Sequence, residues 1–90
     1  MDPKRAAKEA KLARKLTRWR AATASVLAQT RKDCGHTQQT LSVELGWTRA
    51  QVANIEAGRR FLELAELQLF ADAFSMDPER LYRRILRWDE

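Results

Sequence analysis

The sequence predicts an all-α fold with five helices, and three observations lead to it. Apolar residues recur at spacings of three and four, the repeat of a helix that buries one face. The 90 residues hold only two prolines and three glycines, and no alternating β-branched run that would indicate a strand. Threonine, aspartate and glycine stand where such helices would begin and end. A chain of this length makes one domain with a modest core, too small for a separate ligand-binding domain.

The first predicted helix is long. It runs from about residue 5 to Asp33, and Gly35 ends it. Its apolar stripe keeps the helical repeat and consists of Leu12, Leu16, Trp19, Thr23, Val26 and Leu27. We therefore expect one continuous helix that passes from the N-terminal segment into the folded domain.

Two short helices with a sharp turn between them follow, over residues 38–60. Leu41 and Leu45, four apart, give the first of them one apolar edge. Gly46 ends it, because glycine enters the left-handed conformation without a steric penalty. Thr48 begins the next helix, and Gln51 three residues later completes a Thr-x-x-Gln capping box.

The second short helix has its own buried edge. Val52 and Ile55 lie three apart, and Gly58 ends the helix as Gly46 ends the one before. A short helix, a tight glycine turn and another short helix form the helix-turn-helix layout, which places a helix in the major groove of DNA.

Two more helices complete the prediction. The fourth carries an apolar stripe made of Leu64, Leu67, Phe70, Ala71 and Phe74. Asp77 caps the fifth, and Pro78 occupies its favoured first-turn position. On this last helix Leu81, Ile85 and Trp88 share one side, and an exposed apolar stripe of this kind often marks an interface. We expect these three residues to form a dimer interface; the alternative is that they close the core of the monomer.

The charge is unevenly distributed along the chain. Its net value is +5, and residues 1–20 carry eight basic side chains against two acidic ones. Residues 21–90 carry nine basic and ten acidic groups and are nearly neutral. A basic surface attracts polyanions, nucleic acid first among them. We therefore predict a basic N-terminal extension over residues 1–20 and a helix-turn-helix DNA-binding domain over residues 21–90.

The outward side of the second short helix predicts which residues read bases. Arg49 leads from the first turn, and the small Ala50 and Ala53 allow close approach to the groove. Arg49 can donate two hydrogen bonds to guanine, and Asn54 can pair with adenine, each worth about 1–3 kcal/mol of discrimination. We assign base reading to Arg49, Ala50 and Asn54, and place Ala53 and Gln51 on the flank. Gln51 caps the helix or contacts DNA; the alternative for Arg49 and Asn54 is solvated helix surface.

Other residues are candidates for phosphate contact, which gives affinity without sequence choice. Gln38 opens the first short helix, where its side chain and the exposed N–H groups can meet a phosphate. Thr48, Arg59 and Arg60 flank the base-reading helix, and a solvated loop is the alternative for the two arginines. In the extension we predict phosphate contacts from Lys11, Arg14, Lys15 and Arg18.

The extension also has readings other than a phosphate-binding arm. Its apolar residues Leu12, Leu16 and Trp19 could pack on Tyr82, Ile85 or Trp88 of the same chain or of a dimer partner. A frayed, solvated terminus and a membrane-surface helix are the remaining alternatives. We favour packing combined with phosphate contact.

Several residues together resemble the lambda repressor and Cro-like family, also called the xenobiotic-response-element (XRE) family. The resemblance covers about residues 22–82 and rests on Gln38, Leu41, Leu45, Gly46, Thr48, Val52, Ile55, Glu56 and Gly58. It implies a five-helix domain that binds operator DNA as a dimer, with base reading at Arg49, Ala50 and Asn54 and a phosphate contact at Gln38. It also implies an ion pair between Arg31 and Glu56, with a structural role.

The chain departs from the family pattern at a few positions. Trp47 replaces a small aliphatic residue in the turn. Glu63, a poor N-cap, stands where serine or threonine is usual, and Ser75 replaces the glycine that commonly ends the fourth helix. These departures affect the boundaries of the fourth helix more than the base-reading pair.

Enzymatic and metal-binding functions find little support. Cys34 is the only cysteine and His36 the only histidine, so a four-ligand zinc site would need many carboxylates. We expect no catalysis, cofactor or metal, no membrane span, and a cytoplasmic location, since one cysteine permits no internal disulfide. The interpretation is a transcriptional repressor that binds a palindromic operator in double-stranded DNA as a homodimer. The alternative is an antitoxin-like module that binds a partner protein, with DNA binding secondary.

Overall fold

The computed structural model describes residues 2–88, which form five α-helices and no strand, as predicted. The helices are α1 (Pro3–Asp33), α2 (Gln38–Leu45), α3 (Arg49–Glu56), α4 (Leu64–Ala73) and α5 (Pro78–Leu86). The outermost residues of the two predicted ranges, Met1, Asp89 and Glu90, lie outside the described part. Among residues 2–88, none of the helices combines the length and the apolar character that crossing a membrane requires.

Helix α1 sets the length of the molecule. Its 31 residues rise about 46 Å at 1.5 Å each, close to the longest extent of the chain, 49 Å. It begins at Pro3, slightly earlier than expected, because the Asp2 carboxylate accepts a hydrogen bond from the N–H of Lys4 at 3.0 Å. Proline suits the first helical position, where no N–H is needed.

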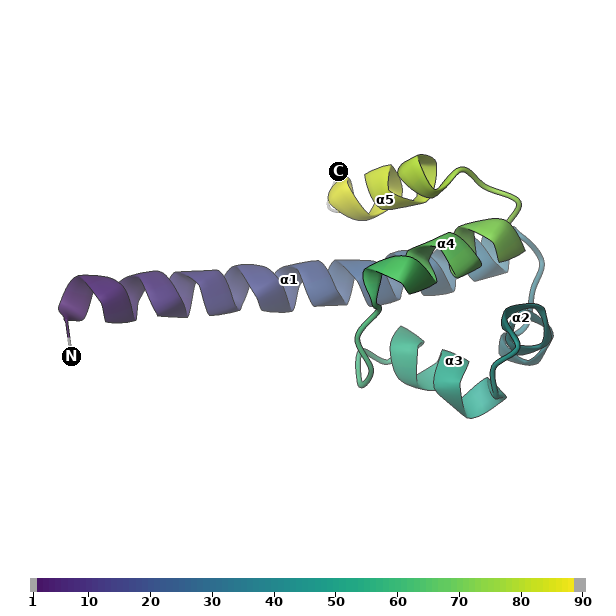
Figure 1. The fold of residues 1–90 in the computed structure, drawn as a ribbon, viewed down its shortest axis with the longest axis horizontal. Coiled ribbons are helices and arrows are strands. Elements are labelled where there is room, and N and C mark those ends of the chain that lie inside the picture. The colour runs from purple at the N-terminus through teal and green to yellow at the C-terminus, as the bar shows by residue number, and fades with distance from the viewer. Residues whose placement is uncertain (1, 89–90) are drawn as a thin grey trace.

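The N-terminal half of α1 projects away from the other four helices (Figure 1). Residues 2–20 are exposed except for the half-buried Ala6, and Ala22 is the first buried residue. The predicted division between residues 20 and 21 therefore falls inside one continuous helix, at the point where burial begins. Leu12, Leu16 and Trp19 remain 41–51% exposed, so residues 2–88 leave a large part of that stripe uncovered.

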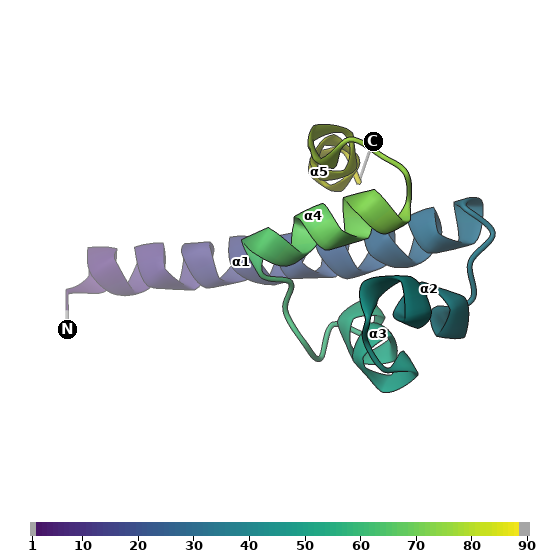
Figure 2. The same ribbon diagram turned by 45° about the vertical axis from the view of Figure 1, so that its right-hand side comes forward.

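The core lies where the C-terminal half of α1 meets the other helices. All five helices contribute to it, through Ala22, Val26, Leu27, Leu41, Val52, Ile55, Phe70, Ala71, Phe74, Leu81 and Ile85. Phe70 occupies the middle of α4 and is fully buried, with Phe74 tilted against it at 5.9 Å between ring centroids. This core fixes α2 and α3 on one side of α1 and α5 on the opposite side, as two views agree (Figures 1 and 2).

The dimer stripe predicted on α5 needs correction. Leu81 is 0% and Ile85 5% exposed, because α5 packs against both α1 and α4. The prediction that these two residues form an exposed interface is wrong, and they close the core of the monomer. Trp88 remains 42% exposed, and on the other flank of α5 Tyr82 and Leu86 are 52% and 44% exposed. The helical repeat alone does not tell a core stripe from an interface stripe.

The two departures at α4 have visible structural effects. Glu63 is the residue before the helix, and its own side chain supplies no cap; its N–H instead donates to the carboxylate of Glu66 at 2.9 Å. At the other end Ser75 adopts a φ of +52°, the left-handed conformation that glycine favours. The helix ends at Ala73, and two residues later Ser75 takes a conformation that is strained for a residue with a Cβ.

Candidate nucleic-acid interface

Reciprocal hydrogen bonds fix the start of α2. The Thr37 hydroxyl accepts from the N–H of Thr40 at 3.0 Å, and the Thr40 hydroxyl accepts from the N–H of Thr37 at 2.9 Å. The usual Ser/Thr-x-x-Glu/Gln motif does not detect this capping box, because threonine occupies the position of the acid or amide. The sequence signal that does indicate it is a threonine directly before an apolar helical repeat. At the other end Gly46 takes a φ of +68° and turns the chain toward α3.

The start of α3 has the capping box that the sequence predicts. Thr48 accepts from the N–H of Gln51 at 3.2 Å, and Gln51 Oε1 accepts from the N–H of Thr48 at 2.8 Å. One role of Gln51 is therefore the cap, and its Nε2 keeps both hydrogens for another acceptor.

The burial of α3 agrees with the orientation that its apolar repeat predicts. Val52 is 0% and Ile55 2% exposed, and both belong to the core. On the outward side Arg49, Ala50 and Gln51 are exposed, and Ala53 and Asn54 are half-buried. Within residues 2–88 the Arg49 side chain makes no hydrogen bond or ion pair, so its five donors stay available. The contacts of this face with bases remain a prediction.

A buried polar network locks α3 to α1. Arg31 and Glu56 form a two-pronged ion pair, Nε to Oε2 at 2.8 Å and Nη2 to Oε1 at 3.1 Å. Their side chains are only 11% and 6% exposed. Arg31 Nη1 also donates to the backbone oxygen of His36 at 2.8 Å, and Gln38 Nε2 donates to Glu56 Oε1 at 3.1 Å. The pair that the family resemblance implies is confirmed, and it reaches into the start of α2 as well.

Gln38 and Arg49 border the same hollow, although they belong to different helices. The hollow has a volume of about 520 Å³ and lies between the start of α2 and the start of α3. Gln38 commits one Nε2 hydrogen to Glu56 and keeps the second. The structure thus places a free amide hydrogen, the N-terminal end of α2 and a guanidinium around one space. This grouping suits an anionic oxygen, because helix N-termini and arginine both favour negative charge.

Arg60 is held inside the domain. Its guanidinium forms a two-pronged pair with Glu66, in which Nη1 donates to Oε1 at 3.2 Å, and it lies 4.5 Å above the ring of Trp47. The hydrogen bond from Arg60 lowers the pKa of the Glu66 carboxyl, and the Glu66 carboxylate in turn raises the pKa of Arg60. Trp47 meets Phe70 edge to face at 5.4 Å, so the unusual turn residue anchors the turn to α4.

Arg59, the neighbour of Arg60, is different. It is exposed, and its side chain has no hydrogen-bond or ion-pair partner within the described residues. Arg59 is therefore available to an external anion, whereas Arg60 would have to exchange Glu66 for it.

The predicted phosphate contacts of the extension lie apart from α2 and α3. Lys11, Arg14, Lys15 and Arg18 are exposed on the projecting half of α1 (Figure 1). The structure does not bring them together with Gln38 or Arg49, so any contact they make with DNA would be outside the helix-turn-helix footprint.

The described part of the chain offers no cluster for a metal. Among residues 2–88, no group of three or more histidine, cysteine, aspartate or glutamate side chains could hold an ion. The His36 ring pairs through Nδ1 with the Thr40 hydroxyl at 3.0 Å. Cys34 is exposed, with its sulfur 3.9 Å from the backbone oxygen of Phe74.

Comparisons with known proteins agree with this geometry. The profile of a family described as a helix-turn-helix domain matches residues 8–83. A solved XRE-family-like protein from Pseudomonas syringae pv. tomato str. DC3000 is 25% identical, with a TM-score of 0.73, over 90% of this chain and 98% of that one. No curated protein sequence matches.

Two restriction-modification controller proteins share the fold. C.AhdI from Aeromonas hydrophila is 28% identical over 68% of this chain and 92% of its own, with a TM-score of 0.63. C.Esp1396I, solved as a tetramer in complex with its 35 base-pair operator, is 23% identical over 77% of this chain and 96% of its own, with a TM-score of 0.65.

Proposed function

Because this chain belongs to the helix-turn-helix domain family and resembles its XRE-like members, we propose that it is a sequence-specific regulator of transcription that binds double-stranded DNA. The observation that carries the proposal is the orientation of α3. Its apolar edge is buried and its start is capped, so Arg49, Ala50 and Asn54 face outward from a helix that the Arg31–Glu56 pair holds in place.

In this proposal α3 enters the major groove. The small Ala50 and Ala53 let the helix backbone approach the base edges closely. Arg49 donates two hydrogen bonds to a guanine, and Asn54 pairs with an adenine on the same face. Gln51 Nε2, which the cap leaves free, lies at the edge of this face and contacts a flanking base or phosphate.

The phosphate backbone is bound around the hollow between α2 and α3. Gln38 and the N-terminal end of α2 bind one phosphate there. We assign a further phosphate contact to Thr48, the residue that caps the start of α3. Arg59 binds a second phosphate beyond the end of α3. Arg60 can bind the same phosphate only if it breaks its ion pair with Glu66, so we expect Arg60 to contribute less to the affinity than Arg59 does. The extension adds phosphate contacts from Lys11, Arg14, Lys15 and Arg18.

We further propose that the chain acts as a homodimer and represses a promoter by occupying a palindromic operator. A twofold dimer places two α3 helices about one DNA turn, 34–36 Å, apart. C.Esp1396I, which shares the fold, binds its operator as an oligomer. With Leu81 and Ile85 buried, the exposed apolar side chains left for a dimer within α5 are Tyr82 and Leu86, while Trp88 borders a separate groove between α1 and α5.

In vitro selection of bound sequences from a random DNA pool tests the base-reading assignment. We expect the wild type to select a palindrome. Arg49→Ala and Asn54→Ala should each relax the preference at one position of each half-site and weaken binding by about 1–3 kcal/mol. Lys32→Ala, an exposed change at the far end of α1, is the control and should leave motif and affinity unchanged. If both α3 variants select the wild-type motif at wild-type affinity, α3 does not read bases.

The exposed stripe on α1 supports a second candidate, an antitoxin-like module whose main partner is a protein. Leu12, Leu16 and Trp19 are each about half exposed in the part of the chain that the structure describes. Purification from the native host would then recover a second polypeptide at a fixed ratio. That polypeptide should be lost from Leu12→Ser/Leu16→Ser and kept by Arg49→Ala. Recovery of no second polypeptide from the native host favours the regulator alone.

A further inference from the structure

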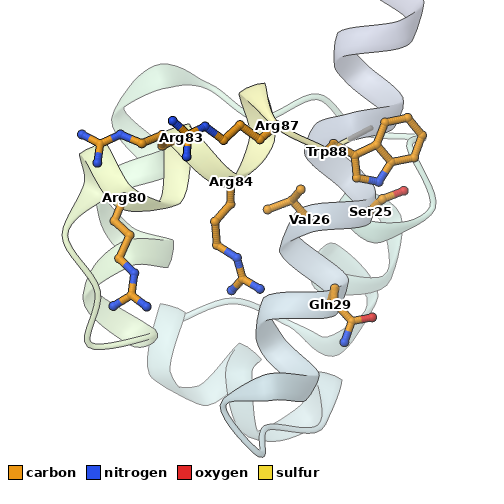
Figure 3. Close-up of a pocket in the computed structure, with 8 residues that line it drawn as sticks. All are labelled: Ser25, Val26, Gln29, Arg80, Arg83, Arg84, Arg87 and Trp88. Atoms are coloured by element: carbon orange, nitrogen blue, oxygen red, sulfur yellow. The ribbon is translucent and has the colours of Figure 1, made fainter. Parts of the chain in front are cut away.

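A second surface, unrelated to α3, carries concentrated positive charge. A groove of about 620 Å³ lies between α1 and α5. Four arginines from α5 and its C-terminal end border it (Arg80, Arg83, Arg84 and Arg87), with Val26 of α1 and the indole of Trp88 (Figure 3). We call this surface the arginine groove. Because α5 and α3 lie on opposite sides of α1, it stays open when α3 is on DNA (Figures 1 and 2).

Only one of the four arginines has its charge satisfied within the described chain. Arg84 donates to the Thr30 hydroxyl and to Asp33 Oδ2, both at 2.9 Å, which fixes it to the end of α1. Over residues 2–88, no side-chain hydrogen bond or ion pair involves Arg80, Arg83 or Arg87. Among residues 2–88, no carboxylate is one of the side chains that line the groove.

The electrostatics of α5 itself do not explain this arrangement. The four residues recur at spacings of three and four, at which like charges on a helix repel one another. The helix dipole favours cations near the C-terminus, which suits Arg83, Arg84 and Arg87. It disfavours Arg80 in the first turn. An external anion would relieve both the mutual repulsion and the misplaced charge.

We propose that the arginine groove binds an acidic helical segment of a partner protein. The cations repeat at the helical pitch over about two turns, so carboxylates with the same repeat on another helix can meet them in sequence. Figure 3 shows the guanidinium groups at separate places along α5 rather than turned toward one point, as a small anion would require. Beside Arg84, on the α1 side of the groove, the indole of Trp88 is 42% exposed and offers apolar contact to such a helix, whereas Val26 is largely buried.

Two other occupants fit less well. A duplex held by α3 lies on the far side of α1 and does not reach the groove. A second copy of this chain, packed groove to groove about a twofold axis, would set arginine against arginine, and like-charge juxtaposition disfavours that pairing. Charge complementarity therefore points to an acidic helix from a different polypeptide.

The test uses the full chain and a synthetic helical peptide with glutamates along one face and leucines along the next. We expect one peptide per chain to bind in isothermal titration, and the same peptide with glutamine for glutamate not to bind. The variant Arg80→Glu/Arg87→Glu should bind the glutamate peptide at least about tenfold more weakly than the wild type does. The same variant should bind a peptide in which lysine replaces each glutamate. Both positions are exposed, and circular dichroism checks that the variant folds.

Lys4→Glu/Lys8→Glu makes the same change of net charge on the projecting half of α1 and is the matched control. It should keep wild-type affinity for the acidic peptide. The inference is overturned if this control loses binding as the groove variant does, or if the wild type binds no acidic peptide. It is also overturned if the groove variant splits a homodimer in sedimentation. DNA selection by Arg80→Glu/Arg87→Glu should match the wild type, which separates this result from the proposed function.

Discussion

The guanidinium of Arg31 and the carboxylate of Glu56 meet in a two-pronged pair, 25 residues apart in sequence, that joins the end of α1 to the end of α3. Both side chains are nearly buried, and Gln38 donates to the same carboxylate. The outward direction of α3 therefore depends on a contact made at its last residue. The interface is built as much by this contact as by the apolar edge of α3.

Removal of one partner of this pair should be strongly destabilising. Glu56→Ala leaves the Arg31 charge buried without a counter-charge, and we expect a loss of about 3–5 kcal/mol in the free energy of unfolding. Urea denaturation followed by circular dichroism measures it. Arg31→Met/Glu56→Leu removes both charges and should recover most of the loss. Asp33→Ala, which breaks the exposed pair with Arg84, is the control and should lower stability much less than Glu56→Ala. If Glu56→Ala and Asp33→Ala lowered the free energy of unfolding by similar amounts, the burial of the Arg31–Glu56 pair would not be the source of its contribution.

The Arg60–Glu66 pair should make stability depend on pH in the acidic range. Hydrogen bonding from Arg60 lowers the pKa of Glu66 below its ordinary value of 4.5 in the folded chain. The unfolded chain therefore binds more protons in that window, so the free energy of unfolding rises with pH there. The contribution is fully present above pH 4.5 and is lost as the pH falls through the lowered pKa.

Glu66→Gln isolates this effect. At neutral pH we expect the wild type to be more stable than the variant by about 1 kcal/mol, because the Arg60 guanidinium is about a third exposed. The difference should shrink as the pH falls below 4.5. Asp33, whose pKa is also lowered, by hydrogen bonds from Arg84 and Gln29, is present in both proteins and cancels in the comparison. A difference that stays constant with pH would rule out the ion pair as its source.

The local features of the fold were predictable from the sequence because each has a local cause. Gly46 and the Thr48–Gln51 box set the turn and the start of α3 through bonds within a few residues. The inward direction of Val52 and Ile55 follows from their spacing. All of these depend on short stretches of chain, where sequence patterns carry the most information.

What was not predictable depends on distant packing. Leu81 and Ile85 have the same spacing whether they face a core or a partner, and only the docking of α5 on α1 and α4 decides it. The partners of Arg60 are likewise set by tertiary contact, since Trp47 reaches it from the turn and Glu66 from α4. The arginine groove exists only because α5 lies beside α1.

The left-handed backbone conformation of Ser75 leads to a prediction about stability. Its φ of +52° is uncommon for a residue with a Cβ, and the left-handed conformation costs such a residue about 1–2 kcal/mol. Ser75→Gly removes this strain but adds freedom to the unfolded chain, so we expect a net gain of about 0.5–1 kcal/mol. Ser75→Ala keeps a Cβ and should bring no gain. Thermal unfolding of the two variants checks this, and an equal shift for both would place the effect elsewhere than in the backbone conformation.

The salt dependence of DNA binding tests the projecting half of α1. Each phosphate contact releases counterions, so its loss reduces the slope of log affinity against log salt by about 0.9. Lys11→Gln/Arg14→Gln/Lys15→Gln should therefore flatten the slope by about 2–3, while the selected motif stays that of the wild type, because base reading is assigned to α3. Lys4→Gln/Lys8→Gln/Lys32→Gln removes the same charge from other exposed positions of α1 and should change the slope less. Equal slopes for the first variant and the wild type would mean that Lys11, Arg14 and Lys15 do not contact DNA. Protein contact through the apolar stripe beside them would then be the main role of this half of the helix.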